Sequence, residues 1–463
     1  MPRLEETIVV NRSAGDCFRY LVDFSTIEQW DPGVYRAEKR TAGAPEVGTV
    51  FDVTLSSAGR RIPMQYELVD ITDGDQLVLL GSGDRVTARD VISVEAVDAE
   101  TTRIHYIADL EFSGLMGAVV PALKPWLNRV GVKAVEGMRR ALEIPNSPPE
   151  HTVVDSLKQK AVLPAAWDFT ERGYLNMERK GLSEFVDGKT AVITGPTSGL
   201  GLATACELAR LGSELILVGR NRDKLSNAVR DIRAFSGRSE GDIEVVEADL
   251  AELDQVRRAA HQVAGLADSV EILVNNAGAL FDDRQETVDG HERALAINLL
   301  SPFVLTEALI DKLDAGNGRV INVASGGMYM QPLRLDDMEY RASSYDGTKA
   351  YARAKRGLVA LTDHWAAEFG DRSVTFNSMH PGWADTPGVS RSLPKFYSAL
   401  EGRLRDARMG ADTIVWLATS GAVDGVSGRF FFDRKPRPKA IFDGTEVTDD
   451  QRQQLVGWLR DHC

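Results

Sequence analysis

The chain has 463 residues, of which 43% are hydrophobic and 26% charged, and its formal net charge is -14. This length is too great for a single core and predicts two or three ordinary globular domains. Acidic residues outnumber basic ones in both the first third and the remainder, which argues against nucleic acid or an anionic membrane as the main partner.

Targeting and redox signals are weak in this sequence. The three cysteines, Cys17, Cys206 and Cys463, are scattered and form no metal-binding or disulfide pattern, so a reducing compartment is expected. The first ten residues, MPRLEETIVV, lack the sustained apolar run of a signal peptide. The most apolar segment, 114–127, contains a lysine and two prolines and does not read as a transmembrane segment. We therefore expect a cytoplasmic protein.

Residues 1–143 alternate in the manner of β-structure, with a helix near each end. The strand ETIVVN is followed by a helical run with Ser13 as a candidate N-cap, and the segment closes with a long apolar helix over about 115–142, interrupted by Pro121 and Pro125. Between them lie five further strand candidates: GTVFDVTLSS, RRIPMQYELVDI, DQLVLLGSG, RDVISVEAVD and TTRIHYIADLEF. The pattern predicts an α+β domain in which a sheet wraps around a helix.

This order of elements, with the stretch FRYLVDFSTIEQWDPGV, resembles the START-like or polyketide cyclase-like superfamily. The resemblance covers residues 1–143 and implies a helix-grip fold around a cavity for a lipid, steroid, polyketide or other apolar ligand. Candidate cavity residues are Trp30, Phe112, Met116 and Trp126, with ordinary core packing as the alternative. No metal cluster or acid/base pair is evident, and His105 reads as structural, so the sequence does not predict an enzyme here.

Residues 144–187 form the expected linker and lead-in. The proline-rich run IPNSPPEHT cannot continue the preceding helix and marks a domain boundary. The following AWDFTERGYLNMERKGLSEFVDG mixes aromatic and charged residues, as short helices packed on a neighbouring surface do. We expect this lead-in to belong structurally to the second domain.

From residue 188 to 463, strands and helices alternate, which predicts an α/β doubly wound parallel sheet of the Rossmann type with a C-terminal extension. The strand candidates are TAVIT, ELILVG, IEVVEADL, VEILVNNAG, RVINVAS, VTFNSMHPG and RFFFD. After the first of these comes TGPTSGLG, whose glycines suit a turn that delivers a pyrophosphate to a helix N-terminus.

The spacing TGxxxGxG resembles the short-chain dehydrogenase/reductase superfamily, and the resemblance extends over about residues 188–435. It implies that NAD(P) is bound by the glycine-rich turn, by the acidic residue after the third strand, by NNAG after the fourth, and by the HPGWADT loop. The implied cofactor residues are Gly195, Thr197, Ser198, Gly199, Leu200, Gly201, Asp249, Leu250, Asn276, Ala277, Gly278, Pro381, Gly382 and Thr386.

The same resemblance implies the catalytic residues. Asn298 matches the family's helix Asn that supports a proton-relay water, and Ser325 matches the hydroxyl that holds the substrate carbonyl. A Tyr and a Lys four residues apart occur twice in YDGTKAYARAKRGLVAL, residues 345–361, and this spacing places both on one helix face. The ammonium is expected to lower the pKa of the phenol.

Two observations select Tyr351 and Lys355 over Tyr345 and Lys349. The PG turn begins 30 residues after Tyr351 and 36 after Tyr345, and only the shorter spacing agrees with the family. The apolar face of the helix also continues in register with the second pair. Tyr351 and Lys355 are therefore predicted to act in catalysis and to contact the cofactor, and the first pair to begin the helix.

Cofactor choice depends on the residue after the second strand. A carboxylate there usually accepts the ribose hydroxyls of NAD, but this chain has Gly219 followed by Arg220. A guanidinium can fork onto a 2'-phosphate, so NADP(H) is favoured and NAD(H) is the alternative. The alternative role for Arg220 is a solvated residue that stacks on adenine.

The predicted function is NADP(H)-dependent interconversion of a carbonyl and an alcohol on a hydrophobic small molecule. The insertion between Ser325 and Tyr351 resembles the retinol dehydrogenase-like and, more closely, the dehydrogenase/reductase member 12-like branch, and it implies a partly enclosed substrate mouth. Two alternatives remain: a lipid-binding or transfer protein whose dinucleotide domain senses redox state, and a bifunctional cyclase-ketoreductase. The superfamily commonly pairs subunits, so a homodimer is also open.

Overall fold

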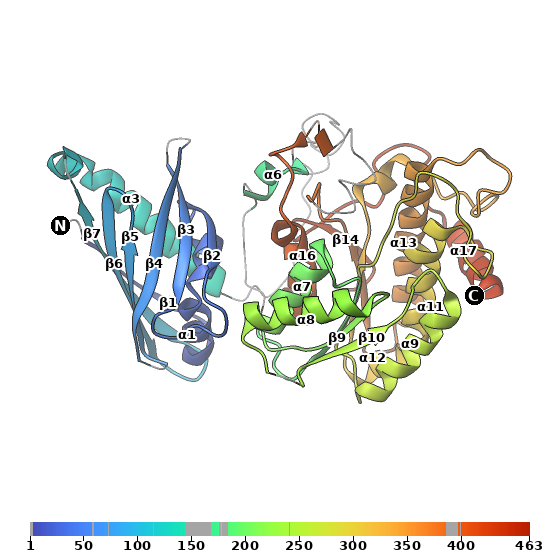
Figure 1. The fold of residues 1–463 in the computed structure, drawn as a ribbon, viewed down its shortest axis with the longest axis horizontal. Helices are drawn as coiled ribbons and strands as arrows, with labels where there is room; N and C mark the ends of the chain where they lie inside the picture. Colours follow the sequence, from blue (N-terminus) through green and yellow to red (C-terminus); the bar gives the residue numbers. More distant parts are fainter. Residues whose placement is uncertain are drawn as a thin grey trace. The chain divides into compact units, whose positions relative to one another are not determined.

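The computed structural model of the chain forms two compact units, one made mainly of residues 1–146 and the other mainly of residues 147–463 (Figure 1). The residues that it describes are 3–57, 60–72, 74–113, 115–143, 168–175, 177, 184–239, 241–385, 397–398 and 400–463, with backbone alone at 57 and 115–128. The expected linker lies largely outside the described residues, so its limits stay a prediction. Within the described part, every helix is too short or too polar to cross a membrane.

The first unit is an antiparallel sheet of seven strands in the order β1-β7-β6-β5-β4-β3-β2. Its strands are β1 Arg3–Val10, β2 Val34–Lys39, β3 Val50–Ser57, β4 Arg60–Thr72, β5 Gln76–Ser82, β6 Val86–Ala96 and β7 Thr102–Phe112. Its helices are α1 Ala14–Val22, η1 Phe24–Thr26, α2 Ile27–Trp30 and α3 Leu115–Leu142. Figure 1 shows α3 lying along one face of this sheet, and the predicted helix-grip class is confirmed.

One core fills this unit. Inward residues of the strands, such as Phe51 and Leu68, pack with Phe24 and with Met138 from the second half of α3. Trp30 belongs to this core, whereas Phe112 is half-buried at the end of β7. The side chains of Met116 and Trp126 lie outside the described residues, so their predicted place beside a cavity stays a prediction.

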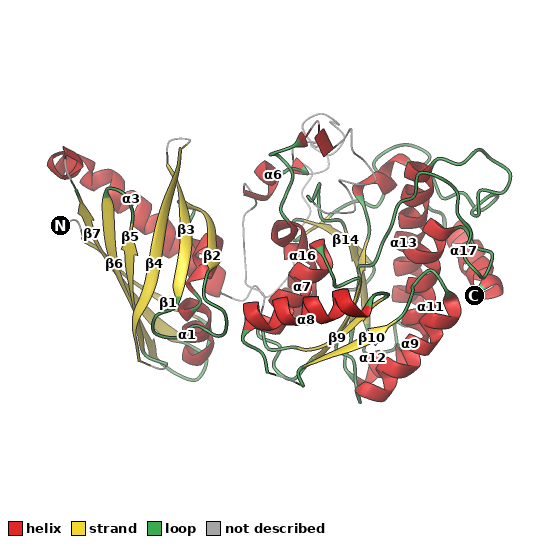
Figure 2. Ribbon diagram, in the orientation of Figure 1, coloured by secondary structure: helices red, strands yellow, loops and turns green. Residues whose placement is uncertain are grey.

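The second unit is a sheet of eight strands in the order β10-β9-β8-β11-β12-β13-β14-β15, all parallel except β15 (Figure 2). The strands are β8 Thr190–Thr194, β9 Glu214–Gly219, β10 Ile243–Glu247, β11 Ile272–Asn275, β12 Arg319–Val323, β13 Thr375–Met379, β14 Arg429–Phe432 and β15 Lys435–Pro436. The strand order reverses between β8 and β11, and sheets of this kind bind ligands at the carboxyl ends of the strands beside such a reversal. The doubly wound prediction is confirmed.

The helices of this unit cover both faces of the sheet. They are α6 Glu171–Leu175, α7 Gly199–Arg210, α8 Arg222–Ser236, α9 Leu253–Leu266, α10 Arg293–Leu295, η2 Ala296–Leu300, α11 Ser301–Ala308, α12 Ile310–Ala315, η3 Gly326–Met330, α13 Gly347–Glu368, α16 Ala407–Thr419, η4 Gly421–Val423 and α17 Asp449–His462.

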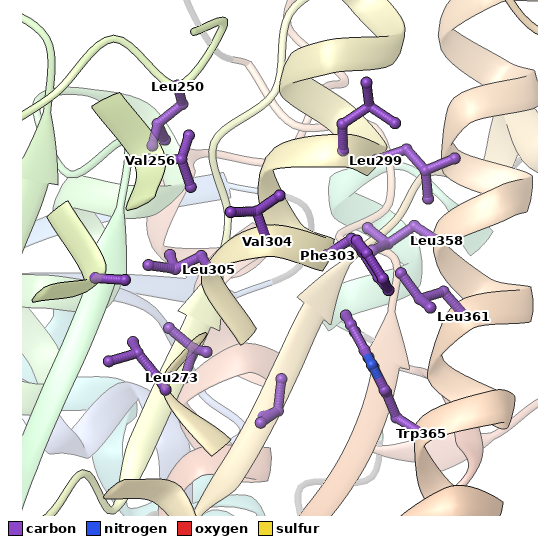
Figure 3. Close-up of a cluster of buried hydrophobic side chains, with 14 of the residues drawn as sticks. Leu250, Val256, Leu273, Leu299, Phe303, Val304, Leu305, Leu358, Leu361 and Trp365 are labelled. Carbon is purple, nitrogen blue, oxygen red and sulfur yellow. The ribbon is translucent and has the colours of Figure 1, made fainter. Parts of the chain in front are cut away.

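A buried apolar cluster between the sheet and α9, α11 and α13 fixes the helix that carries the Tyr/Lys pair (Figure 3). The rings of Phe303 and Trp365 stack with centroids 6.4 Å apart, and the Trp365 indole donates to Glu307 at 2.9 Å. A Cβ on Gly357 would lie 2.8 Å from Leu299, so glycine allows α13 to approach η2 closely. This contact brings Asn298 of η2 toward α13.

Candidate active site

The glycine-rich turn between β8 and α7 is too tight to accept side chains. Gly195 and Gly199 have φ angles of 65° and 54°, in the left-handed region. A Cβ on Gly201 would clash with the carbonyl oxygen of Gly195 and lie 2.5 Å from Nδ2 of Asn276. Glycine at these positions lets the turn pack against the helix and leaves its backbone accessible to a ligand.

The segment after β11 holds this turn in place. The Asn276 side chain donates to the carbonyl oxygens of Thr194 and Gly195, at 2.8 and 3.2 Å. The backbone amides of Asn276 and Ala277 both donate to the Thr194 hydroxyl at 3.0 Å. The two strand ends that flank the reversal of strand order are thus joined by hydrogen bonds.

The start of α7 suits an anion. Ser198 is its N-cap residue but makes no capping hydrogen bond among the described residues, whereas α8 and α13 are capped by Asn221 and Asp346. Uncapped amides and the helix dipole favour a negative group, so the residues present fit a dinucleotide pyrophosphate. Thr197 precedes the cap and is half-buried.

The other predicted cofactor residues differ in their surroundings. The side chains of Leu200 and Leu250 pack into the interior, so only their backbone is available to a ligand. Asp249 follows β10, and its carboxylate accepts from the Ala251 amide at 3.0 Å. Arg220 is exposed directly after β9, and Thr386 lies outside the described residues.

Helix α13 brings Tyr351 and Lys355 to the carboxyl end of β12. The Lys355 ammonium is buried, donates to the carbonyl oxygen of Val323 at 2.7 Å, and lies 5.8 Å from the centre of the Tyr351 ring. Ser325 lies two residues beyond β12, close enough to the Tyr351 hydroxyl to favour a lower pKa of that phenol. The structure therefore brings these three predicted catalytic residues together.

Asn298 approaches the same place from the π-helical turn η2, a helix type that is frequent at functional sites. Its Nδ2 donates to the carbonyl oxygens of Ala279 and Ala294, at 2.8 and 2.7 Å. Its Oδ1 is buried and has no partner among the described residues. A Cβ on Gly278 would lie 2.8 Å from this Oδ1 and 3.3 Å from Nζ of Lys355, so glycine leaves room between them.

Burial controls the protonation of this site. It lowers the pKa of Lys355 to about 7 and raises the pKa of Tyr351, while the nearby Ser325 hydroxyl opposes the latter shift. We expected the ammonium to lower the pKa of the phenol, and the structure gives the opposite direction for Tyr351. The reason is that both groups are removed from water, which disfavours the charged form of each.

The second Tyr/Lys pair is engaged elsewhere. The Tyr345 hydroxyl donates to the buried carboxylate of Glu292 at 3.0 Å, and burial together with this carboxylate raises the pKa of Tyr345. Lys349 is exposed and lies 3.4 Å from Asp346. Both residues therefore stabilise the start of α13, outside the Ser325 group.

The sequence predicted that the lead-in packs on the second domain, but not that its residues 168–175 form a strap beside Ser325. A Cβ on Gly326 would lie 3.7 Å from the Phe169 ring, and the Phe169 carbonyl accepts from the Trp383 amide at 2.7 Å. The buried Arg405 donates to the carbonyl oxygens of Asp168 and Thr170, at 2.6 and 3.1 Å. The aromatic residues after the proline-rich run were the available signal.

The loop after β13 packs tightly against this strap. Gly382 has a φ of 76°, and a Cβ there would lie 2.6 Å from Arg405, which also forms a buried ion pair with Asp433 at 2.5 Å. His380 stacks on Phe432 with centroids 4.1 Å apart, and burial holds the pKa of His380 well below its usual value. His380 is therefore a neutral packing residue.

The described part of the chain holds no group of three or more His, Cys, Asp or Glu side chains arranged for a metal ion. The site instead combines one hydroxyl, one phenol, one amine and one amide around a dinucleotide-compatible turn. Such a set can hold a carbonyl oxygen and move a proton to or from it.

Comparison with known proteins agrees with both units. The family described as "short chain dehydrogenase" matches residues 189–395, and the family described as "Polyketide cyclase / dehydrase and lipid transport" matches residues 1–143. Similarity is also found to "Dehydrogenase/reductase SDR family member 12" of Homo sapiens, 40% identical over 54% of this chain and 78% of that protein. The Bos taurus protein of that name is 38% identical over 64% of this chain and 96% of its own length. "Retinol dehydrogenase 13" of Mus musculus is 31% identical over 55% of this chain and 79% of that protein.

Proposed function

The chain belongs to the short-chain dehydrogenase/reductase family and is an oxidoreductase with a dinucleotide-binding domain; on that premise we propose that it uses NADP(H) to interconvert a carbonyl and an alcohol on an apolar small molecule. The observation that carries the proposal is the convergence of Ser325, Tyr351 and Lys355 at the end of β12. Asn298 reaches the same place from η2.

Each polar residue has a role that follows from its surroundings. The nicotinamide, when bound, supplies or accepts the hydride. In the reductive direction the Ser325 hydroxyl holds the substrate oxygen, and the Tyr351 phenol donates the proton. Lys355 binds the cofactor ribose and replaces the phenol's proton. The unpaired Oδ1 of Asn298 holds a water that returns a proton to Lys355.

The NADP(H) preference is supported by Arg220. It follows β9 directly, its side chain is exposed, and the residue before it is a glycine, so no carboxylate of that strand end repels a 2'-phosphate. A guanidinium forms paired, charge-assisted hydrogen bonds with phosphate oxygens.

An apolar substrate is supported by the residues around Ser325. The Phe169 ring lies 3.7 Å from the Cβ position of Gly326 and packs edge-on to Trp383 with ring centroids 5.5 Å apart. The buried Arg356 donates to the carbonyl oxygen of Met328 at 2.8 Å, which fixes the insertion. A relative of this chain carries the name retinol dehydrogenase, which states an apolar alcohol as the substrate of that protein. We also propose that the first domain binds an apolar ligand, in keeping with the lipid transport family that it matches.

The test is NADPH oxidation by the full chain with a panel of apolar ketones and aldehydes, and with polar sugars for contrast. Tyr351→Phe removes the proton donor and is expected to reduce turnover by about 10²-fold or more. Tyr345→Phe is the matched control, because it removes the same atom from a phenol bound to Glu292, and it should keep turnover while lowering stability. If Tyr345→Phe abolished turnover and Tyr351→Phe retained it, the assignment would be wrong.

A further inference from the structure

The inner face of the first unit's sheet carries a group of polar side chains that the proposed reaction does not use. Asp90 lies on β6 with Ala88 and Ile92 on the same inward face, where the alternation of a strand calls for apolar residues. Tyr106 points inward from the neighbouring strand β7, and Tyr66 points inward from β4, which is separated from β6 by β5. The fold thus gathers a carboxyl and two phenols inside an otherwise apolar core.

These groups are hydrogen-bonded and fixed. Asp90 is 2% exposed, and the Tyr106 hydroxyl donates to its Oδ1 at 3.3 Å. Tyr66 also acts on the Asp90 carboxyl and favours a lower pKa for it. A Cβ on Gly81, the residue paired with Tyr66 across β4 and β5, would lie 2.6 Å from the phenol ring, so glycine lets this ring lie on the sheet.

No basic group among the described residues is one of those that act most strongly on Asp90. After burial, the largest effects on its pKa come from Tyr106, Asp31 after α2, Tyr66 and Asp109. Burial raises the pKa of Asp90 to about 7 and that of Asp31 to about 6. Near neutral pH a large share of Asp90 is therefore protonated and able to donate a hydrogen bond.

A further donor in this group has no acceptor. Trp30 is 2% exposed, and its indole N–H has no partner among the described residues. Its ring packs edge-on to Tyr106 with centroids 6.2 Å apart. A buried donor without an acceptor is destabilising, and a ligand oxygen can satisfy it.

We propose that Asp90, Tyr66, Tyr106 and Trp30 form the polar end of a binding site in the first domain for an apolar ketone. The carbonyl oxygen accepts hydrogen bonds from the Trp30 indole and from the Asp90 carboxyl, and the two phenols position that carboxyl. This deepens, and rests on, the proposal that the first domain binds an apolar ligand. A ketone belongs to the same chemical class as the carbonyl substrate proposed for the second domain. The first domain therefore selects its ligand by the carbonyl as well as by apolar surface.

The probe is benzophenone, an apolar diaryl ketone that on irradiation attaches through its carbonyl carbon to nearby C–H groups. Peptide mass spectrometry of the irradiated full chain then identifies the attached residues domain by domain. We expect attachment next to Tyr66, Trp30 or Tyr106. Competition with fluorenone and with fluorene, which has the same rings but no carbonyl, measures what the carbonyl contributes. Fluorenone should compete at a roughly tenfold lower concentration, as expected for one good hydrogen bond.

Four variants separate the explanations. Asp90→Leu and Tyr106→Phe should each abolish the preference for fluorenone, whereas Asp52→Asn, an outward carboxylate on β3, should leave it unchanged. Asp90→Asn keeps a donor without a titrating group. The wild-type preference should shrink as the pH rises through 7, because ionised Asp90 has no proton to donate and repels the carbonyl oxygen. The preference of Asp90→Asn should be constant with pH. Thermal unfolding of each variant verifies that it is folded.

The outcomes are distinct. An absence of benzophenone attachment in the first domain would overturn its ligand-binding role and this inference with it. Attachment there with equal competition by fluorenone and fluorene, or a preference that survives Asp90→Leu and Tyr106→Phe, would overturn the ketone site alone. The NADPH oxidation assay tests the second domain independently of either result.

Discussion

Replacing Lys355 with Met is expected to stabilise the protein while destroying its activity. Burial holds the pKa of Lys355 at about 7, against an ordinary 10.5. Between these values the unfolded chain binds a proton that the folded chain lacks, so the free energy of unfolding rises with pH in this window. Relative to a neutral side chain of similar length, the buried lysine lowers the free energy of unfolding by about 4 kcal/mol at pH 7 and by about 2 kcal/mol at pH 9.

The assay is thermal and urea unfolding of the full chain without cofactor at these two pH values. Lys355→Met should unfold roughly 10 °C higher than the wild type at pH 7, with a gain about half as large at pH 9. Turnover should fall by about 10²-fold or more. Lys349→Met is the control, because it removes an exposed ammonium that pairs with Asp346. It should change the free energy of unfolding by less than about 0.5 kcal/mol at either pH. A Lys355→Met protein that is less stable than the wild type, or whose gain is the same at both pH values, would refute the reasoning.

Three further predictions concern the cofactor and the pocket. Gly201→Ala should weaken NADP(H) binding at least about tenfold in a fluorescence titration, because the added Cβ would clash with the Gly195 carbonyl. Gly265→Ala on α9, where the Cβ meets open space, should leave binding unchanged. Equal affinities of the two variants would contradict the proposed role of the turn. Arg220→Glu should reverse the preference from NADPH to NADH by placing a carboxylate beside the 2'-phosphate, and an unchanged ratio of dissociation constants would remove Arg220 from cofactor selection. Phe169→Ala should raise KM for apolar ketones more than it lowers kcat, and it should lower stability by about 3 kcal/mol; steady-state kinetics with unaltered KM would place Phe169 outside the pocket.

The strands of the second unit could be predicted from sequence because they are buried on both faces and read as continuous apolar runs, as in TAVIT and ELILVG. The short strands β2 and β15 were missed. β2 is an edge strand with only two of six residues fully buried, so its pattern is weak. β15 has two residues and exists through its pairing with β14 across a turn in which Asp433 and Arg434 have positive φ. Neither residue is a glycine, so the sequence gives no signal for a turn at this place.

The polar groups of the candidate active site could be named from sequence only through family motifs. Their separation along the chain does not show that they lie close together in the fold. What the motifs could not provide is the environment: the burial that shifts Lys355, and the strap that brings Phe169 next to Gly326. The first domain gives a similar lesson. Asp90 stands out as an acid at an inward strand position, but its meeting with Tyr66 and Tyr106 depends on the register of four strands.

The strap also alters where the second domain begins. The dinucleotide-binding fold is complete from β8 onward, and the family match starts at residue 189. A protein cut at that point would keep every strand of the sheet but would lose the strap beside Ser325. It would also leave Arg405, 1% exposed, without two of its carbonyl acceptors. A chain that retains these contacts therefore begins at or before Asp168, whereas the family match begins at residue 189.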